Sequence, residues 1–299
     1  MIARLQQALV AVVLCAVVTW LVWMWPRSPL LALGGAVALV SVHGLVLALE
    51  FVILWRVNRT EPVPQPSARQ LLRAWWLETR MGWQVFGWRQ PFRSAAVADR
   101  VTAGSFVPGR CGVVLVHGFV CNRGFWNPWL TQLRQAGHPF IAVNLEPVFG
   151  SIDDYAAMLD AAVREMAAAS GRPPVLVCHS MGGLAARAWL RTAADAHVAH
   201  VITIGSPHGG TWLGRFSRTA NGRQMHLGSG WVGTLGSSES VERRARFTCW
   251  YSNCDNVVFP ASTATLAGAD NRLVPGAPHV ALAFHHEVMR ASLAKISAL

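Results

Sequence analysis

Hydrophobic residues are concentrated at the beginning of the chain, whereas the remainder alternates between apolar and polar stretches. Residues 5–25 carry no charged side chain, and residues 30–55 contain only Glu50 and His43 as titratable groups. A helix needs about 20 apolar residues to cross the hydrocarbon core of a bilayer. Since only four residues, two of them prolines, separate these stretches, the pattern predicts a tight hairpin of two antiparallel membrane-spanning helices, which we place at residues 1–57.

A cleaved signal peptide is the main alternative for the first apolar stretch. Signal peptides have a basic start and a short apolar core, whereas this chain has only Arg4 at its start, a long apolar run and a second run close behind. We therefore expect the hairpin to be retained as an anchor. Glu50 and His43 could form a functional pair inside the membrane, but the sequence favours Glu50 reaching the interface and His43 bonding to the other helix.

Positive charges flank the hairpin unequally. Arg4 precedes the first helix and five arginines lie within residues 56–80, whereas Arg27 stands alone in the turn. Because basic residues are enriched on the cytoplasmic side, both termini are predicted there. Five cysteines follow the hairpin and cannot all pair, which agrees with a reducing compartment, although Cys249 and Cys254 could form a disulfide in an exported domain.

Beyond the hairpin, the pattern predicts a linker and one α/β domain. Three prolines within residues 61–66 favour a stiff, extended segment, so we place a Pro/Arg-rich linker at residues 58–74 and the domain at residues 75–299. Short apolar runs then alternate with segments of helical periodicity, which predicts a mostly parallel sheet with helices on both faces. The expected strands are residues 112–116, 140–145, 175–178, 201–204, 247–251 and 263–266, and the clearest helices are residues 153–169 and 280–298.

Composition and charge narrow the classes of partner. The 299 residues are 53% hydrophobic and 14% charged, and 26 Lys and Arg against 15 Asp and Glu give a net charge of +11. Such a charge suits anionic lipid or nucleic acid, but the arginines are scattered and form no nucleic-acid-binding motif. The cysteines lack the spacing of metal ligands. We expect a membrane partner, no nucleic acid, no metal and no cofactor.

A candidate nucleophile lies where the third expected strand ends. The apolar residues 175–178 lead through His179 to Ser180, and a helix-forming segment follows at once. A serine in such a turn has its hydroxyl above the sheet edge, at a helix N-terminus that favours a developing negative charge. Gly182 supplies the second glycine of the motif G-x-S-x-G, but Cys178 occupies the position of the first. Taken alone, Ser180 could also be an ordinary capping residue.

Other strand ends carry residues that fit the same chemistry. His117-Gly118-Phe119 follows the strand at residues 112–116, where a glycine lets the loop turn and offer an N–H to an oxyanion. Asp255 comes just after the strand at residues 247–251, and His279 lies in the last loop. The order along the chain is therefore nucleophile, acid, histidine.

On these motifs, over roughly residues 110–290, the chain resembles the α/β-hydrolase superfamily and, within it, bacterial triacylglycerol lipases. The resemblance implies that Ser180 is the nucleophile, His279 the general base and then acid, and Asp255 the group that orients His279. It also implies that the N–H groups of Phe119 and Met181 form the oxyanion hole. The supporting residues expected near the site are His117, Gly118, His179, Gly182 and His208.

Competing histidines and acids fit the expected pattern less well. His285 and His286 fall within the predicted last helix, one or two turns beyond the final loop. Asp270 lies in or after the strand that follows Asp255, where this superfamily normally has no triad member. We therefore keep His279 and Asp255 as the predicted pair.

The predicted function combines the hairpin with this site. Residues 212–246 interrupt the strand alternation with mixed apolar and glycine residues, which predicts a lid over Ser180 or an ordinary surface insertion. Apolar residues near the site favour an ester with an apolar acyl group, either a lipid or a small ester. We predict a membrane-anchored serine ester hydrolase, with an acyltransferase using the same triad or a non-catalytic scaffold as alternatives.

The predicted location is the bacterial inner membrane. The arginine distribution places the catalytic domain on the cytoplasmic side. The resemblance to a family of secreted proteins argues for the opposite side. The sequence carries no prediction of oligomeric state.

Overall fold

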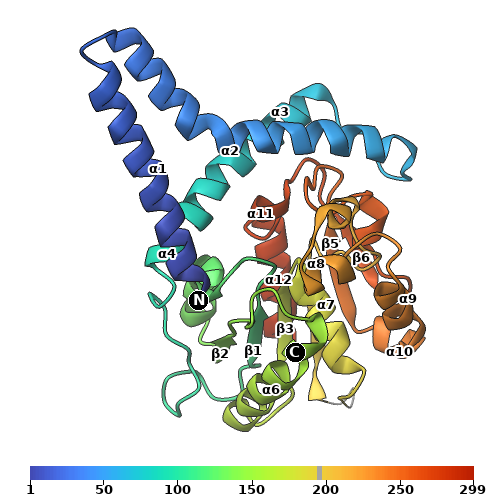
Figure 1. Cartoon of the computed structure of the whole chain (residues 1–299). Helices are drawn as coiled ribbons and strands as arrows, with labels where there is room; N and C mark the ends of the chain where they lie inside the picture. The colour runs from blue at the N-terminus through green and yellow to red at the C-terminus, as the bar shows by residue number, and fades with distance from the viewer. Residues whose placement is uncertain (194–196) are drawn as a thin grey trace.

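The structure is a computed structural model that describes residues 1–193 and 197–299 (Figure 1). Within these residues, six strands form one parallel sheet in the order β2-β1-β3-β4-β5-β6. The strands are β1 (Val113–Val116), β2 (Phe140–Ala142), β3 (Val175–His179), β4 (His200–Ile204), β5 (Phe247–Tyr251) and β6 (Asp270–Leu273). The predicted α/β class with a mostly parallel sheet is confirmed.

The position of the last strand differs from the prediction. Residues 263–266 were expected to be a strand, but this segment overlaps the 3-10 helix η7 (Ala261–Ala264) and forms no strand. The sixth strand is β6 instead, which pairs with β5 and is largely exposed. A polar sequence suffices there because β6 lies at the sheet edge, where charged side chains are common. The hydrophobic pattern therefore could not reveal it.

Helices cover both faces of the sheet, as the apolar strand sequences require. The covering helices are α5 (Asn127–Gln135), α6 (Ala156–Ser170), α7 (Met181–Leu190) and α12 (His286–Ala298). Val113 and Leu115 of β1 point into the core that contains residues of α5 and α12. Val114 and Val116 point into the opposite core, with residues of α6 and α7. Both faces of the strand are thus removed from water.

Two predicted helices are present with altered boundaries. The helix expected at residues 153–169 is the 3-10 helix η4 (Ile152–Tyr155) followed by α6, and Gly171 ends it in a left-handed conformation with φ 72°. The helix expected at residues 280–298 is divided into α11 (His279–Leu282) and α12. The division occurs because His285 has an extended backbone.

The remaining elements of the domain are short. Between β1 and α5 lies the 3-10 helix η3 (Arg123–Trp126). Residues 212–246, predicted as a lid or insertion, contain four helices of one or two turns, which are η6 (Trp212–Phe216), α8 (Ala220–Gln224), α9 (Gly230–Ser237) and α10 (Val241–Arg244).

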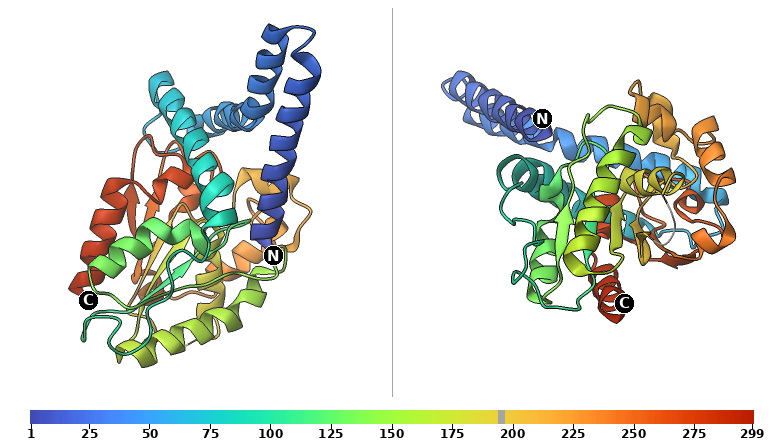
Figure 2. Two further views of the ribbon diagram at one scale, coloured as in Figure 1. Left: turned by 90° about the vertical axis from the view of Figure 1, so that its left-hand side faces the viewer. Right: turned by 90° about the horizontal axis from the view of Figure 1, so that it is seen from below.

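The start of α1 and the second half of α2 pack against the domain, and the rest of the hairpin projects from it (Figures 1 and 2). The elements are α1 (Ile2–Met24), α2 (Pro29–Val57), the 3-10 helix η1 (Asn58–Thr60), α3 (Ala68–Gln84), the π-helix η2 (Val85–Arg89) and α4 (Gln90–Phe92). At its start α1 is held by Gln6, whose Nε2 donates to the carbonyl of Val120 at 3.2 Å. By length and composition, α1 and Pro29–Thr60 could each cross a membrane.

The segment predicted as a linker follows the surface of the domain. Asn58 Nδ2 donates to the carbonyl of Asn253 at 3.4 Å, and Asn253 Nδ2 donates to the carbonyl of Pro64 at 2.7 Å. Helix α3 begins at Ala68, inside the range 58–74, because Ser67 and Gln70 form a capping box there. These contacts fix the end of α2 against the loop that carries Asp255.

Candidate active site

Ser180 lies at the sharp turn between β3 and α7. Its backbone has φ 54° and ψ −127°, a region that residues other than glycine rarely occupy. Gly182 allows the turn to pack closely on β1, because a Cβ there would lie 2.4 Å from the carbonyl oxygen of Val116. The turn thereby holds the Ser180 side chain at the carboxyl end of the sheet and at the N-terminus of α7.

Cys178 stands where the motif usually has its first glycine, and its side chain is accommodated in the core. Cys178 is fully buried between Val116 of β1 and Thr203 of β4. Burial raises the pKa of its thiol, so the thiol stays protonated and unreactive. A side chain at this position therefore does not prevent the turn from forming.

Asp255 and His279 are joined although 24 residues separate them. His279 Nδ1 donates to Asp255 Oδ2 at 2.9 Å. The backbone N–H groups of Val257 and Val258 donate to Asp255 Oδ1 at 3.0 and 2.8 Å, which orients the carboxylate. Gly205 at the end of β4 makes room for the pair, because a Cβ there would lie 2.9 Å from Asp255 Oδ2. Such a contact fixes the tautomer of an imidazole and supports its charged form.

Ser180 and His279 line the same cavity of about 190 Å³. Both side chains are almost completely buried, with 7% and 5% of their surface exposed. Among the described residues, no hydrogen bond joins the Ser180 hydroxyl to the imidazole.

The loop after β1 approaches Ser180 closely. A Cβ at Gly118 would lie 2.8 Å from Ser180 Cβ, so only glycine fits. His117 fastens this loop, because its Nδ1 donates to the carbonyl of Gly118 at 2.9 Å and its Nε2 accepts from the N–H of Leu145 at 3.1 Å. Burial lowers the pKa of His117 to about 4, so the ring is neutral and acts as a brace. Phe119, which follows, also lines the cavity.

The other two predicted supporting histidines have different surroundings. His179 Nε2 donates to the carbonyl of His279 at 3.2 Å, and its ring stacks on Phe125 with centroids 4.5 Å apart. His208 instead contacts the buried Arg187, whose guanidinium donates to the His208 carbonyl at 2.9 Å. It does not line the Ser180 cavity, and so it supports the packing of α7 and not the site.

Three polar residues near His279 were not expected from the sequence. Glu78 of α3 is buried, and its carboxylate accepts from the N–H groups of Val280 at 2.8 Å and Ala281 at 3.2 Å. Asn256 Oδ1 accepts from the N–H of His279 at 3.3 Å, while its Nδ2 donates to Glu50 of α2 at 2.7 Å. Asn256 could have been suspected from its place beside Asp255, but nothing in the sequence around Glu78 indicates its role.

The charges around His279 favour its protonated form. Burial by itself lowers the pKa of His279, but the charge and hydrogen bond of Asp255, with smaller contributions from Glu78 and Glu50, raise it above the ordinary value. Burial raises the pKa of Glu78 to about 7, against the lowering effect of its bond to Val280. A base that gains stability on protonation is suited to take a proton from a hydroxyl group.

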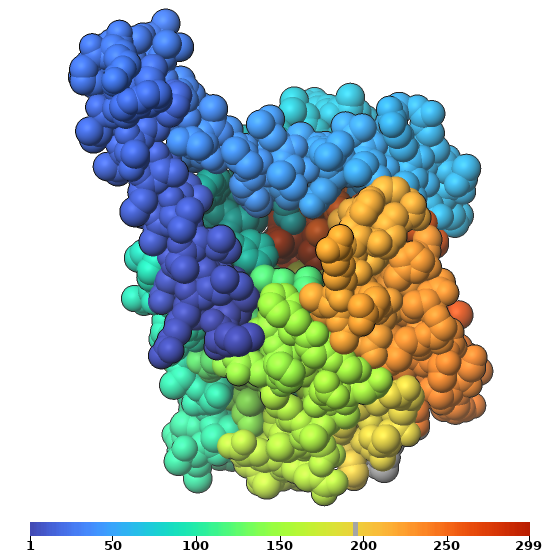
Figure 3. Space-filling model, viewed as in Figure 1, coloured from blue at the N-terminus to red at the C-terminus, as the bar shows by residue number. Residues whose placement is uncertain are grey.

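Helix α2 covers this site, and the segment predicted as a lid does not. His43, Leu47 and Glu50 of α2 line the Ser180 cavity, whereas none of its lining residues comes from 212–246. Figure 3 shows α2 lying across the domain above a hollow. Glu50, which was expected to reach the membrane interface, bonds to Asn256 at the site.

The competing residues considered in the sequence lie outside the site. His285 borders a separate surface cavity formed with α3. Asp270 lies on the edge strand and pairs with Arg272 at 2.7 Å. In the part of the chain that the structure describes, no three His, Cys, Asp or Glu side chains are grouped so that they could hold a metal ion.

Comparison with known proteins identifies the family and the fold. The profile of the alpha/beta hydrolase family matches residues 113–295. No curated protein matches the sequence. Among solved structures, Bacillus licheniformis lipase BlEst2 in its mature form is similar with a TM-score of 0.58 and 19% identity, over 66% of this chain and 96% of that one. Aspergillus fumigatus lipase B is similar with a TM-score of 0.50 and 21% identity, over 59% of this chain and 48% of that one.

Proposed function

Because this chain belongs to the alpha/beta hydrolase family, with residues 113–295 matching it, we propose that it is a membrane-associated serine ester hydrolase acting on esters with apolar acyl groups. The observation that carries the proposal is the meeting of Ser180, on its strained turn, with the bonded pair His279 and Asp255 at one buried cavity. The lipases to which the fold is similar are consistent with this activity.

In the proposed reaction, the Ser180 hydroxyl attacks the ester carbonyl carbon while His279 Nε2 takes its proton. Asp255, bonded to Nδ1 at 2.9 Å, stabilises the imidazolium. The negative oxygen of the tetrahedral intermediate accepts hydrogen bonds from the N–H groups of Phe119 and Met181. The intermediate collapses as His279 returns the proton to the leaving alkoxide, which departs as an alcohol.

A water molecule completes the cycle. His279 takes one proton from the water as its oxygen attacks the acyl-Ser180 carbonyl, and a second tetrahedral intermediate forms. That intermediate releases the carboxylic acid, and Ser180 regains its proton from His279. Atoms and charges are thereby restored, and no cofactor is required.

Membrane association is proposed from the outer surface of the hairpin. Apolar side chains of α1 and α2 are exposed along most of both helices, including Val12, Val22, Leu30 and Val37. Exposed apolar surface of this extent marks a membrane or protein contact. We assign residues 1–57 to the anchor and place the catalytic domain on the cytoplasmic side of a bacterial inner membrane, as the flanking arginines indicate.

The nucleophile is tested with a serine-directed fluorophosphonate and a p-nitrophenyl ester. The purified full-length protein should be labelled at Ser180, and both Ser180→Ala and His279→Ala should lose activity by at least about 10³-fold. His285→Ala, which changes a histidine only six residues beyond His279 but outside the cavity, is the matched control. Full ester hydrolysis by Ser180→Ala would refute the proposal.

A further inference from the structure

We infer that the N-terminal helices form the binding site for the substrate acyl chain, in an apolar cavity between α1, α2, α3 and η2 that a membrane lipid reaches from the bilayer. This inference rests on the proposed function, since it needs an ester held at Ser180. It gives the hairpin a second role besides anchoring. The substrate class that follows is a lipid ester with a long acyl chain.

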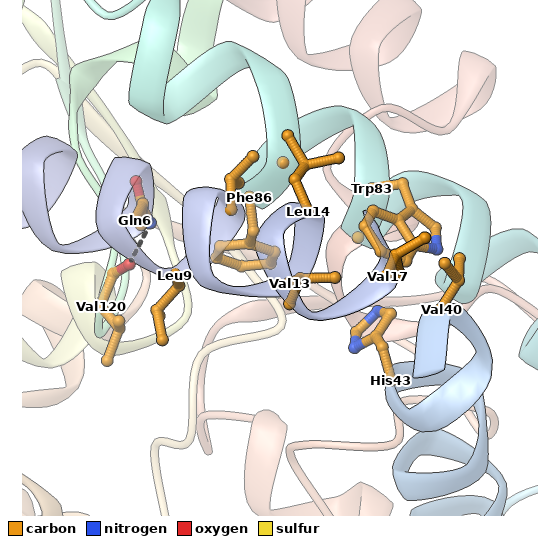
Figure 4. A pocket seen from close by; sticks show the side chains of 13 residues that line it. Gln6, Leu9, Val13, Leu14, Val17, Val40, His43, Trp83, Phe86 and Val120 are labelled. Carbon is orange, nitrogen blue, oxygen red and sulfur yellow. Dashed lines mark hydrogen bonds between the residues drawn. The ribbon is translucent and has the colours of Figure 1, made fainter. Parts of the chain in front are cut away.

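The cavity has the size and chemistry of a hydrocarbon site. Its volume is about 530 Å³, it is open on one side, and Figure 4 shows side chains of α1 near Phe86, Trp83 and His43 around it. Its lining runs along α1 from Gln6 to Val17, which is about 16 Å of helix at 1.5 Å per residue. Apart from the glycines, only Gln6 and His43 are not hydrophobic, and the Gln6 amide nitrogen is already bonded to the Val120 carbonyl.

This cavity adjoins the one at Ser180. His43, Gly82 and Phe86 line both cavities, so these three residues form the boundary between them. The His43 ring packs directly on Gly82, where a Cβ would lie 2.4 Å from His43 Nε2, so the orientation of this ring controls the passage between the cavities. An ester whose carbonyl is at Ser180 would therefore extend its acyl chain past His43 into the larger cavity.

The outer surface of the same helices indicates how an acyl chain reaches the cavity from the bilayer. The buried residues of the second half of α2 are spaced along one face, Gly44, Leu47, Phe51 and Leu54, and this face packs on the domain. The opposite face carries Leu45, Val46, Leu49 and Val52, which are 48–66% exposed. An exposed apolar face of this kind marks a contact with lipid or with another protein. The walls of the cavity are thus the elements that contact lipid in the proposed arrangement.

The inference is tested by filling the cavity and measuring chain-length selectivity. We compare kcat/KM for p-nitrophenyl palmitate and p-nitrophenyl butyrate in full-length protein. Val13 lines the cavity, whereas Val12 is the next residue on α1, is 64% exposed and does not line it. The palmitate-to-butyrate ratio should fall at least about tenfold in Val13→Trp and stay within about twofold of the wild type in Val12→Trp.

A second pair of variants is used if the first cavity variant does not fold. If Val13→Trp is not recovered folded, Val17→Trp replaces it, with the exposed Val18→Trp as its control. An unchanged ratio in the cavity variants, or an equal change in the controls, overturns the inference. That result leaves the proposed function intact as long as Ser180→Ala is inactive, whereas activity in Ser180→Ala refutes the proposed function itself.

Discussion

Glu78 is a buried carboxyl group that belongs to α3 yet contacts the loop of the proposed base. Only 2% of it is exposed, and both carboxylate oxygens accept from the backbone immediately after His279. Burial raises its pKa to about 7, so the proton is lost and the negative charge develops only as the pH approaches and passes that value. Its contribution to stability is therefore present below the ordinary pKa and is lost as the pH rises through about 7.

Replacing Glu78 with Gln should change the pH dependence of the reaction. The negative charge of Glu78 helps to raise the pKa of His279, and the base must be neutral to accept a proton. Without that charge the pKa of His279 falls, so the acid limb of the kcat/KM profile should move to lower pH. Glu287→Gln, an exposed acid in α12, is the control. If the acid limb of the kcat/KM profile does not move in Glu78→Gln, the electrostatic role of Glu78 is contradicted.

At the scale of elements, a buried ion pair ties the helix after Ser180 to the segment 212–246. Arg187 Nε and Nη2 of α7 donate to the two carboxylate oxygens of Glu239 at 2.7 and 2.8 Å, and both side chains are nearly inaccessible. Arg187 also donates to the His208 carbonyl. The segment is thus held against α7 and away from the Ser180 cavity. This explains why it does not cover the site.

Removing Glu239 should destabilise the domain strongly. In Glu239→Ala the guanidinium of Arg187 stays buried without its partner, which costs about 3–5 kcal/mol. The thermal midpoint in detergent micelles should fall by about 10 °C. Glu242→Ala removes an acid that is exposed in α10 and should change the midpoint little. Equal shifts in the two variants would argue against a structural role for the pair.

At the scale of the whole molecule, the hairpin and the domain form one body with an apolar upper surface. The exposed faces of α1 and α2 continue onto α3, where Leu72, Trp76 and Trp83 are also exposed. Tryptophans of this kind favour the headgroup region of a bilayer. The tip of the hairpin, which projects furthest in Figure 2, would then enter the hydrocarbon.

Cys15 provides a direct probe of this arrangement. It is the exposed cysteine on α1, while the other five are buried, and all six are free. A fluorophore attached to Cys15 in vesicles should be quenched by lipids that carry spin labels on their acyl chains. The same fluorophore on Thr102→Cys, in a Cys15→Ser background, should not be quenched. Thr102 is exposed and close to Arg100, which pairs with Phe140 at the amino end of the sheet, opposite the end that α2 covers. Equal quenching at both positions would rule out insertion of α1 into the bilayer.

The sequence by itself determined the features that depend on local pattern. The apolar runs of the hairpin, five of the six strands and the turn at Ser180 follow from the period and length of hydrophobic stretches. Asp255 was predicted just after a strand and His279 in the last loop, and the resemblance to α/β-hydrolases linked both to Ser180. Strand β6 could not be predicted from the hydrophobic pattern, because an edge strand needs no apolar side chains.

Only the tertiary structure decided which element covers the site and which polar groups surround His279. Glu50 and Glu78 are separated from Asn256 and Val280 by about 200 residues, and their contacts exist because α2 and α3 fold back over the sheet. Hydrophobic periodicity shows that α2 has apolar faces but not which one is buried, since its residues are apolar on every side. Which face of α2 is buried was decided by its packing on the domain, between residues that are distant in the chain.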